Sequence, residues 1–382
     1  MNKADRGIPA PAEYKDGEPR TRVSAVIYGF AHYPLNLDAN RRIITEAERL
    51  LGQTAGNVFV LLEGSITPQE ARTLSSLQRE KGLWYTQVES DMLGVFGKTP
   101  KAADVRTYMD QLRNVTIQEI LDYGLLPKNK IRINLFIRDL DDLMRQNPRL
   151  KVRDETQSQA VLNSIRADRD RYREIEQDFH SLWESGDFDR CQAAMSEIFQ
   201  RVNQSRKVRD RGIVQDNLKP ILEGQFKDRK GGAVLAVVGA NHTEGVAEGV
   251  KWTFGKRINC EVILDLPSNH PQLKTKAFVE SEQPIPNELL AQAAFESVVT
   301  GVLNDAFTEG RIVDIFADNF SIIYEAICDI VNATPEEKIR ELCEQHGDII
   351  DYVIDHPSFE HISDLLPEVK ETEAANEIEE QG

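Results

Sequence analysis

Short runs of apolar residues, each bounded by Gly, Asn or a charged residue, recur along the chain and predict buried strands. Their apolar positions are continuous instead of alternating, which is typical of strands that helices cover on both faces. We expect five strands: VSAVIYGF from Val23, NVFVLLEG from Asn57, KIRINLFI from Lys130, AVLAVVGA from Ala233 and CEVILDL from Cys260.

A helical pattern separates the first two of these strands. In LDANRRIITEAERLLGQ, residues 37–53, the apolar positions share one helical face: Ile43, Ile44, Ala47, Leu50 and Leu51. Asp38 or Asn40 is the expected N-cap, since both side chains can accept a hydrogen bond from the first turn. The resulting βαβ unit predicts an α/β fold, with a central, largely parallel or mixed sheet flanked by helices.

The remaining patterns divide the chain into regions. Long, charged helical sequence runs from Asp139 to Phe226, and we interpret it as a helical insertion, a candidate lid, within an α/β domain over residues 21–272. A helical C-terminal region is expected over 273–366. The polar lead at 1–20 is expected to be disordered, as is the acidic tail at 367–382, which has six Glu and one Lys.

Charge and composition exclude several classes of protein. The formal net charge of −17 argues against a nucleic-acid-binding protein, because such proteins carry clustered Lys and Arg. The chain has no signal-peptide pattern and no apolar run of about 18 residues that would span a bilayer, so we expect a cytoplasmic protein. The Glu-rich end also resembles C-terminal secretion signals of some bacterial proteins, which makes export an alternative location. The four cysteines are far apart, which predicts free thiols.

Polar side chains follow three of the predicted strands. His32 follows the first strand, Glu63 ends the second, and His242 follows the strand from Ala233. Gly29 and Gly239 each precede a histidine by three residues, and a glycine permits a tight turn or a close backbone approach there. Ligands in open α/β sheets bind beyond the carboxyl ends of the strands, so we expect the two imidazoles and the carboxylate to converge.

Two chemistries suit such a group. Two His and one Glu are the protein ligands of one class of catalytic zinc site, and a bound divalent ion (Zn, Mn or Co) would activate water at His32, Glu63 and His242. Without metal, His32 or His242 would act as a general base oriented by Glu63.

Four motifs in this order resemble the TraB/Tiki family and its wider relatives, the erythromycin esterases and ChaN-like proteins. The motifs are GFAH (29–32), LLEG (61–64), RDRGIVQDNL (209–218) and VVGANHTEGV (237–246). The resemblance covers about half of the chain and implies a site at His32, Glu63 and His242, with Arg209 as a carbonyl or oxyanion partner and Asp210 in support. Tiki-like members are proposed metal-dependent proteases, the esterases open a macrolactone with activated water, and ChaN-like members bind haem, which is the less favoured cofactor here.

Simpler interpretations stand beside these. A histidine after a strand is more often structural, and the default for Arg209, in the basic run SRKVRD, is a solvated helix face with an intrahelical salt bridge. A dinucleotide turn at VVGANHTEG fails because Asn241 replaces a required glycine, and Gly97-Lys98-Thr99 lacks the first glycine of a phosphate loop. His356 and His361, five positions apart with no second pair, are interpreted as helix-surface residues, and no partner is predicted for His180, His270 and His346.

The sequence thus predicts a hydrolase that attacks an ester or amide carbonyl of a small molecule or peptide. The alternatives are a protein that holds haem, metal or a peptide at the same residues without turnover, and a secreted, host-directed interaction protein. The oligomeric state is left open.

Overall fold

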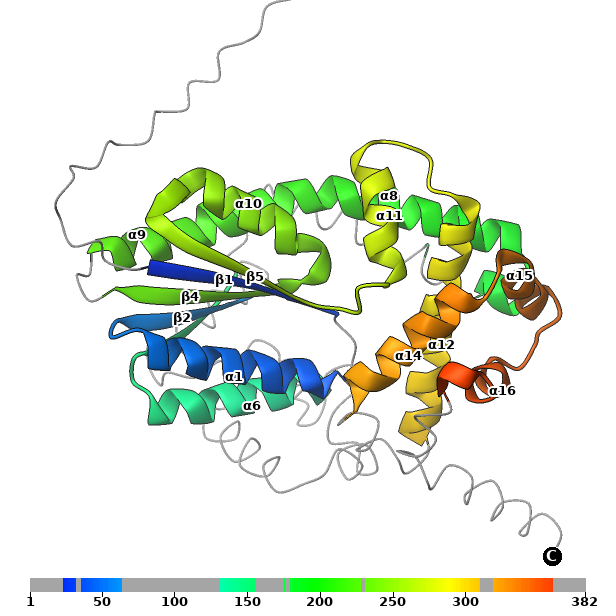
Figure 1. Ribbon diagram of the computed structural model, residues 1–382, viewed down its shortest axis with the longest axis horizontal. Helices are drawn as coiled ribbons and strands as arrows, with labels where there is room; N and C mark the ends of the chain where they lie inside the picture. The colour runs from blue at the N-terminus through cyan, green and yellow to red at the C-terminus, as the bar shows by residue number, and fades with distance from the viewer. Residues whose placement is uncertain are drawn as a thin grey trace, which may run out of the picture.

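A five-stranded parallel sheet forms the centre of one half of the molecule (Figure 1). The computed structural model describes residues 23–31, 36–63, 131–155, 181–227, 231–309 and 319–359, together with Ile175 and Phe179. The strand order is β3-β2-β4-β1-β5, and every neighbouring pair is parallel. The strands are β1 (Val23–Phe30), β2 (Asn57–Leu62), β3 (Leu150–Asp154), β4 (Gly232–Gly239) and β5 (Ile258–Asp265). The predicted α/β fold is confirmed.

Helices cover both faces of the sheet. One face packs against α1 (Leu37–Gln53) and α6 (Ile131–Gln146), and the other packs against η2 (Ile213–Leu218), α9 (Lys219–Lys227) and α10 (Thr243–Phe254) (Figure 1). Every residue of β4 is buried, as its continuous apolar sequence predicted.

The first helix begins earlier than its predicted caps. Asn36 is the N-cap of α1, and its Oδ1 accepts a hydrogen bond from the Ala39 backbone N–H at 3.2 Å. Asp38 and Asn40 lie inside the helix, so the prediction that one of them caps it is wrong.

The predicted strand from Lys130 is also wrong, because residues 131–146 form helix α6. Its buried side chains, Phe136, Leu140 and Leu143, are spaced four and three residues apart and therefore share one helical face. The eight apolar-rich residues alone do not distinguish a strand from a helix, whereas the longer run through Leu143 does.

A strand occurs instead inside the block expected to be helical. In β3, Leu150 and Val152 are buried while Lys151 and Arg153 are exposed, which is the alternation of an edge strand. The residues after it include α8 (Phe188–Gly212), which continues through η2 into α9. The block at 139–226 is therefore part sheet and part helix.

The C-terminal region is helical, as predicted, and has a core of its own. Phe295 and Phe320 pack there together with Phe188, Cys191 and Met195 from the first half of α8. At 25 residues, α8 is about 37 Å long and reaches from this core to the sheet edge. The C-terminal helices are α11 (Pro271–Glu280), α12 (Asn287–Glu309), α14 (Phe320–Ala333), α15 (Glu336–Glu344) and α16 (Ile349–Ile354).

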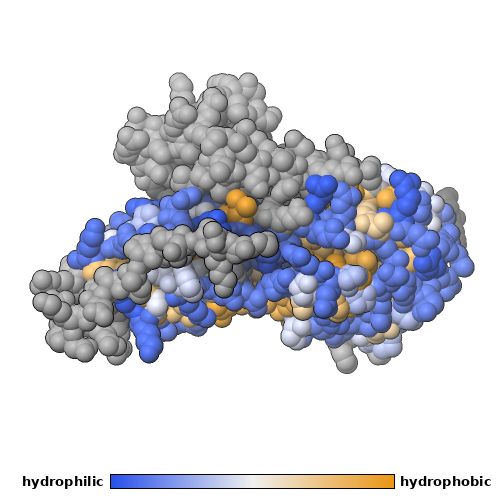
Figure 2. All heavy atoms as spheres, turned by 90° about the horizontal axis from the view of Figure 1, so that it is seen from above, coloured by the Kyte–Doolittle hydropathy of each residue, from blue (hydrophilic) through white to orange (hydrophobic). Residues whose placement is uncertain are grey.

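The described surface is mostly hydrophilic on the side seen in Figure 2, which looks down onto the molecule from above Figure 1. Among the described residues, no helix combines the length and the apolar character needed to cross a membrane. All four cysteines carry free thiols, as predicted. The predicted lead at 1–20 and tail at 367–382 lie outside the described residues.

Candidate functional site

Two glutamates stand at the carboxyl edge of the sheet, one residue beyond their strands. Glu63 follows β2, and its backbone N–H donates to Val237 O at 2.9 Å. Glu155 follows β3, and its backbone N–H donates to Leu62 O at 2.8 Å. Both residues thus extend the hydrogen-bond ladder of the sheet, which fixes where their side chains start.

Glu63 is the centre of the site. Its Oε1 accepts a hydrogen bond from Arg209 Nη2, and its Oε2 accepts one from the backbone N–H of Gly239. The Glu63 side chain is only 9% exposed. Because both oxygens have a donor, the carboxylate is held in one orientation between the end of α8 and the end of β4.

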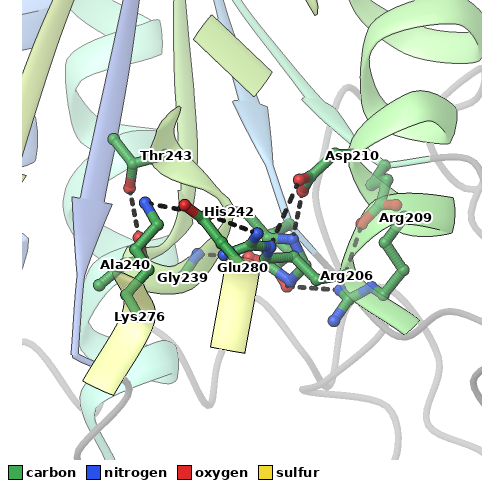
Figure 3. A network of polar contacts seen from close by, with 11 residues as sticks. Arg206, Arg209, Asp210, Gly239, Ala240, His242, Thr243, Lys276 and Glu280 are labelled. Atoms are coloured by element: carbon green, nitrogen blue, oxygen red, sulfur yellow. Dashed lines mark hydrogen bonds and ion pairs between the residues drawn. The ribbon is translucent and has the colours of Figure 1, made fainter. Parts of the chain in front are cut away.

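His242 lies between two carboxylates. It ends the short 3₁₀ turn η3 (Ala240–His242), and its Nδ1 lies 2.6 Å from Oδ1 of Asp210. An ionised carboxylate accepts only, so Nδ1 carries the proton and donates it to Asp210. The other ring nitrogen, Nε2, is 3.5 Å from Glu63 Oε1. Figure 3 shows Asp210 on its helix pointing toward His242.

Arg209 pairs across the molecule and not along its own helix. Besides Glu63, its Nη2 lies 3.8 Å from Oε2 of Glu155, whose side chain is 1% exposed. Burial alone lowers the pKa of Arg209, but the neighbouring carboxylates of Glu63 and Glu155 outweigh burial and raise it above the ordinary value. The guanidinium is therefore a permanent positive charge at the sheet edge, and the simpler interpretation of a solvated helix face does not hold.

A second layer of ion pairs ties α11 to the site (Figure 3). Arg206 bonds Glu280 at 2.8 Å through Nη2, and its Nε lies 3.9 Å from Oδ2 of Asp210. Lys276 pairs with Glu244 at the start of α10. The Asp210 carboxylate is thus flanked by a cation as well as by His242.

The helix changes its winding directly after Arg209 and Asp210. Residues Ile213–Leu218 form a π-helix, and the Ile213 N–H donates to the carbonyls of both Arg209 and Asp210. The Asn217 side chain closes the wide turn by donating to Gly212 O at 3.2 Å. Wide turns of this kind are frequent at functional sites. Here the wide turn separates the residues that reach the sheet edge from those that pack on the sheet face.

The two predicted turn glycines have different roles. A Cβ on Gly29 would come within 1.8 Å of Thr243 Oγ1, so this glycine permits a close approach of α10 to β1. Gly239 has an extended backbone, with φ of −60° and ψ of 144°, that any residue adopts. Its backbone N–H binds Glu63, and no special turn conformation is required there.

The structure brings together Glu63, Arg209, Asp210 and His242. At His242 the predicted orienting role of Glu63 is taken by Asp210, which binds the Nδ1 that fixes the ring, and for His32 that role stays a prediction. His32 lies outside the described residues, and its place in the site stays a prediction. β1, which leads to it, is paired with β4, and β4 is paired with β2.

Glu155 is a site residue that the sequence reasoning missed. In the sequence Glu155 follows LKVRD, in which apolar and charged residues alternate as in a strand. That run was not recognised as a strand, so the carboxylate after it was not considered. The partners Arg206 and Glu280 had no signal, because they are 74 positions apart and belong to different helices.

The described residues do not by themselves fit a divalent metal. Among them, no group of three or more His, Cys, Asp or Glu side chains is arranged to hold one. Glu63 accepts hydrogen bonds from Arg209 and Gly239, and His242 Nδ1 is bound to Asp210. Nε2 of His242 is therefore the atom whose lone pair could bind a metal. His32, the further ligand that the sequence predicts, lies outside the described residues.

No protein-family model matches this chain, and searches of curated proteins and of solved structures also find no match.

Proposed function

We propose that the chain is a hydrolase of the TraB/Tiki-like type, which activates water for attack on an ester or amide carbonyl. The observation that supports it best is the pair formed by Asp210 and His242 at the carboxyl edge of the sheet, with the Arg209 guanidinium beside it. A carboxylate, an imidazole and a cation in this order are the parts of a general-base site.

The proton transfers follow from the tautomer of His242. With Nδ1–H donated to Asp210, Nε2 has the lone pair and accepts a proton from a water molecule. The hydroxide attacks the carbonyl carbon, and the C=O electron pair moves to oxygen. When the oxyanion re-forms the carbonyl, the bond to the leaving alcohol or amine breaks and Nε2 returns the proton to it. Asp210 stabilises the transient imidazolium throughout.

Arg209 and Glu63 supply the electrostatics of this proposal. The Arg209 side chain is 20% exposed, and its Nη2 bonds the same Glu63 oxygen that lies 3.5 Å from His242 Nε2, so the guanidinium is beside the imidazole edge where an oxyanion would form. Glu63 holds that guanidinium and faces His242 Nε2 at 3.5 Å, while Asp210 orients the ring. A metal-dependent version needs His32 as a further ligand, and none of the steps above uses a metal.

The test uses three probes, a p-nitrophenyl ester, a macrolactone and a quenched fluorescent peptide mixture. The variants are His32→Ala, His242→Ala and Asp210→Asn, with His346→Asn as the matched control. His346 is exposed and has φ of 52°, a conformation that Asn tolerates. We expect His242→Ala to lower turnover by about 10²–10⁴-fold, added imidazole to restore part of it, and His346→Asn to be unchanged.

The same preparations are analysed for bound metal and by absorption spectroscopy. Full turnover by His242→Ala, or no turnover of any probe by the unmodified protein, would contradict the proposal. A Soret band without turnover would favour haem binding in its place.

A further inference from the structure

A groove borders the site, between the end of α8 with η2 and the helix α10. Its volume is about 1150 Å³, and Lys207, Arg211, Val214, Lys251 and Trp252 are among the residues that line it. We call it the α8–α10 groove. Pockets for small ligands are usually about 300–1,000 Å³ and enclose most of the ligand, so this groove is large for one.

Two glycines of α10 make the floor of the groove. A Cβ on Gly245 would lie 2.0 Å from Oδ2 of Asp210, and one on Gly249 would lie 2.9 Å from Cγ2 of Val214. Helix α10 therefore contacts α8 at Gly245 and η2 at Gly249. The longer side chains that line the groove lie on either side of these two contacts. Asp210, which meets Gly245 at this floor, is also bound to His242.

The walls of the groove carry positive charge and one large aromatic ring. Lys207, Arg211 and Lys251 are all exposed, as is Glu248, which is the one exposed acid in the lining. The protein as a whole has a formal net charge of −17, so an excess of cations in one groove is a local feature. The Trp252 side chain is 79% exposed, which is unusual for the largest aromatic residue.

We propose that the α8–α10 groove binds an acidic peptide segment that carries an aromatic or other apolar residue. Carboxylates of the segment would pair with Lys207, Arg211 and Lys251, and its apolar residue would pack on the Trp252 ring. An extended nucleic acid fits less well, because it carries a charge at every phosphate along its length and the groove lining offers three exposed cations. A small anion leaves the ring and most of the volume unused.

This binding site is independent of the proposed hydrolase. The groove and the site share only Asp210, whose Oδ1 faces His242 while its Oδ2 faces Gly245. The experiment therefore measures binding, and its result does not depend on turnover.

The probe is an immobilised library of octapeptides built from Asp, Glu, Lys, Phe, Tyr, Ser and Gly, screened with the full chain. The test variants are Arg211→Glu with Lys251→Glu, and Trp252→Ala. Lys256→Glu is the matched control, because Lys256 is exposed, lies five positions from Lys251 and does not line the groove. All four side chains are exposed, so the variants should keep the fold, which thermal unfolding checks.

We expect enrichment of Glu or Asp together with Phe or Tyr, and we expect the selected peptides to bind the double charge-reversal variant at least about tenfold more weakly. Binding should also weaken with added salt, and it should shift the fluorescence emission of the unmodified protein but not that of Trp252→Ala. Lys256→Glu should bind as the unmodified protein does.

Three results would overturn the proposal. They are a library with no acidic enrichment, equal binding by Lys256→Glu and the double variant, and competition by inorganic phosphate at the same concentration as the peptide.

Discussion

Replacing Gly245 by Ala tests the geometry of the site through a single methyl group. The added Cβ would stand 2.0 Å from Asp210 Oδ2, where an ordinary contact is about 3.4 Å. The carboxylate would have to retreat by more than an ångström, and its 2.6 Å contact with His242 Nδ1 would then exceed hydrogen-bond range. A hydrogen bond to a charged group contributes about 1.5–3 kcal/mol to the free energy of unfolding. Ala in place of Gly in a helix adds up to about 1 kcal/mol to it.

Gly224→Ala in α9 is the matched control. A Cβ on Gly224 meets nothing within 4 Å, so this variant should gain about 0.5–1 kcal/mol in the free energy of unfolding. We therefore expect Gly245→Ala to be less stable than Gly224→Ala by about 2 kcal/mol.

The assay is urea unfolding followed by circular dichroism, together with proton NMR of the His242 Nδ1–H. A proton shared with a buried carboxylate resonates far downfield, and this signal should persist in Gly224→Ala and disappear in Gly245→Ala. Equal stability of the two variants with the same downfield signal would refute the pairing of Asp210 with His242.

Two further predictions concern the buried chain in which His270 Nε2 lies 2.5 Å from the Tyr324 hydroxyl, which donates to Glu296 at 2.7 Å. Tyr324→Phe removes both hydrogen bonds from a buried position and should cost about 2 kcal/mol in urea unfolding, so a change below about 0.5 kcal/mol would contradict this role. Burial lowers the pKa of His270 below its ordinary 6.5, although Glu296 partly opposes it. The unfolded chain then takes up its proton at a higher pH than the folded chain, so this stability is complete above pH 6.5 and is lost as the pH falls through the folded-state pKa. The drop in unfolding midpoint between pH 8 and pH 5 should be smaller in His270→Gln, and identical pH profiles would contradict the assignment.

The strands that could be predicted are those with a continuous run of apolar residues, although the predicted burial is wrong for β5, an edge strand in which only Ile258 is buried. β1, β2, β4 and β5 were predicted, and β1 and β4 are buried on nearly every residue. β3 was missed because an edge strand of five residues needs only two apolar positions, Leu150 and Val152. α6 was mistaken for a strand because its first residues are rich in Ile, Leu and Phe, which suit both structures.

The site could be predicted where it depends on the ends of strands. Glu63 and His242 follow strands that the sequence reveals, and parallel pairing brings those ends to one edge. Arg209 and Asp210 were named only through a family resemblance, since a pattern of charges on a helix does not say which face meets the sheet. The role of Asp210 as the partner of His242 depends on how α8 crosses α10, which is tertiary packing.

The wide turn at Ile213–Leu218 determines how the side chains of α8 are rotated about the helix axis relative to those of α9. Each residue of an α-helix advances the chain by about 100° around the axis, so the extra residue in a π-turn offsets everything before it by about that angle. Arg209 and Asp210 owe their direction to this offset. Regular winding would keep the apolar face of α9 on the sheet and rotate both charges away from the edge. The direction of the two side chains therefore depends on the number of residues in the turn. Deleting one residue from it would turn both side chains away from the sheet edge, although every residue of the site would be unchanged.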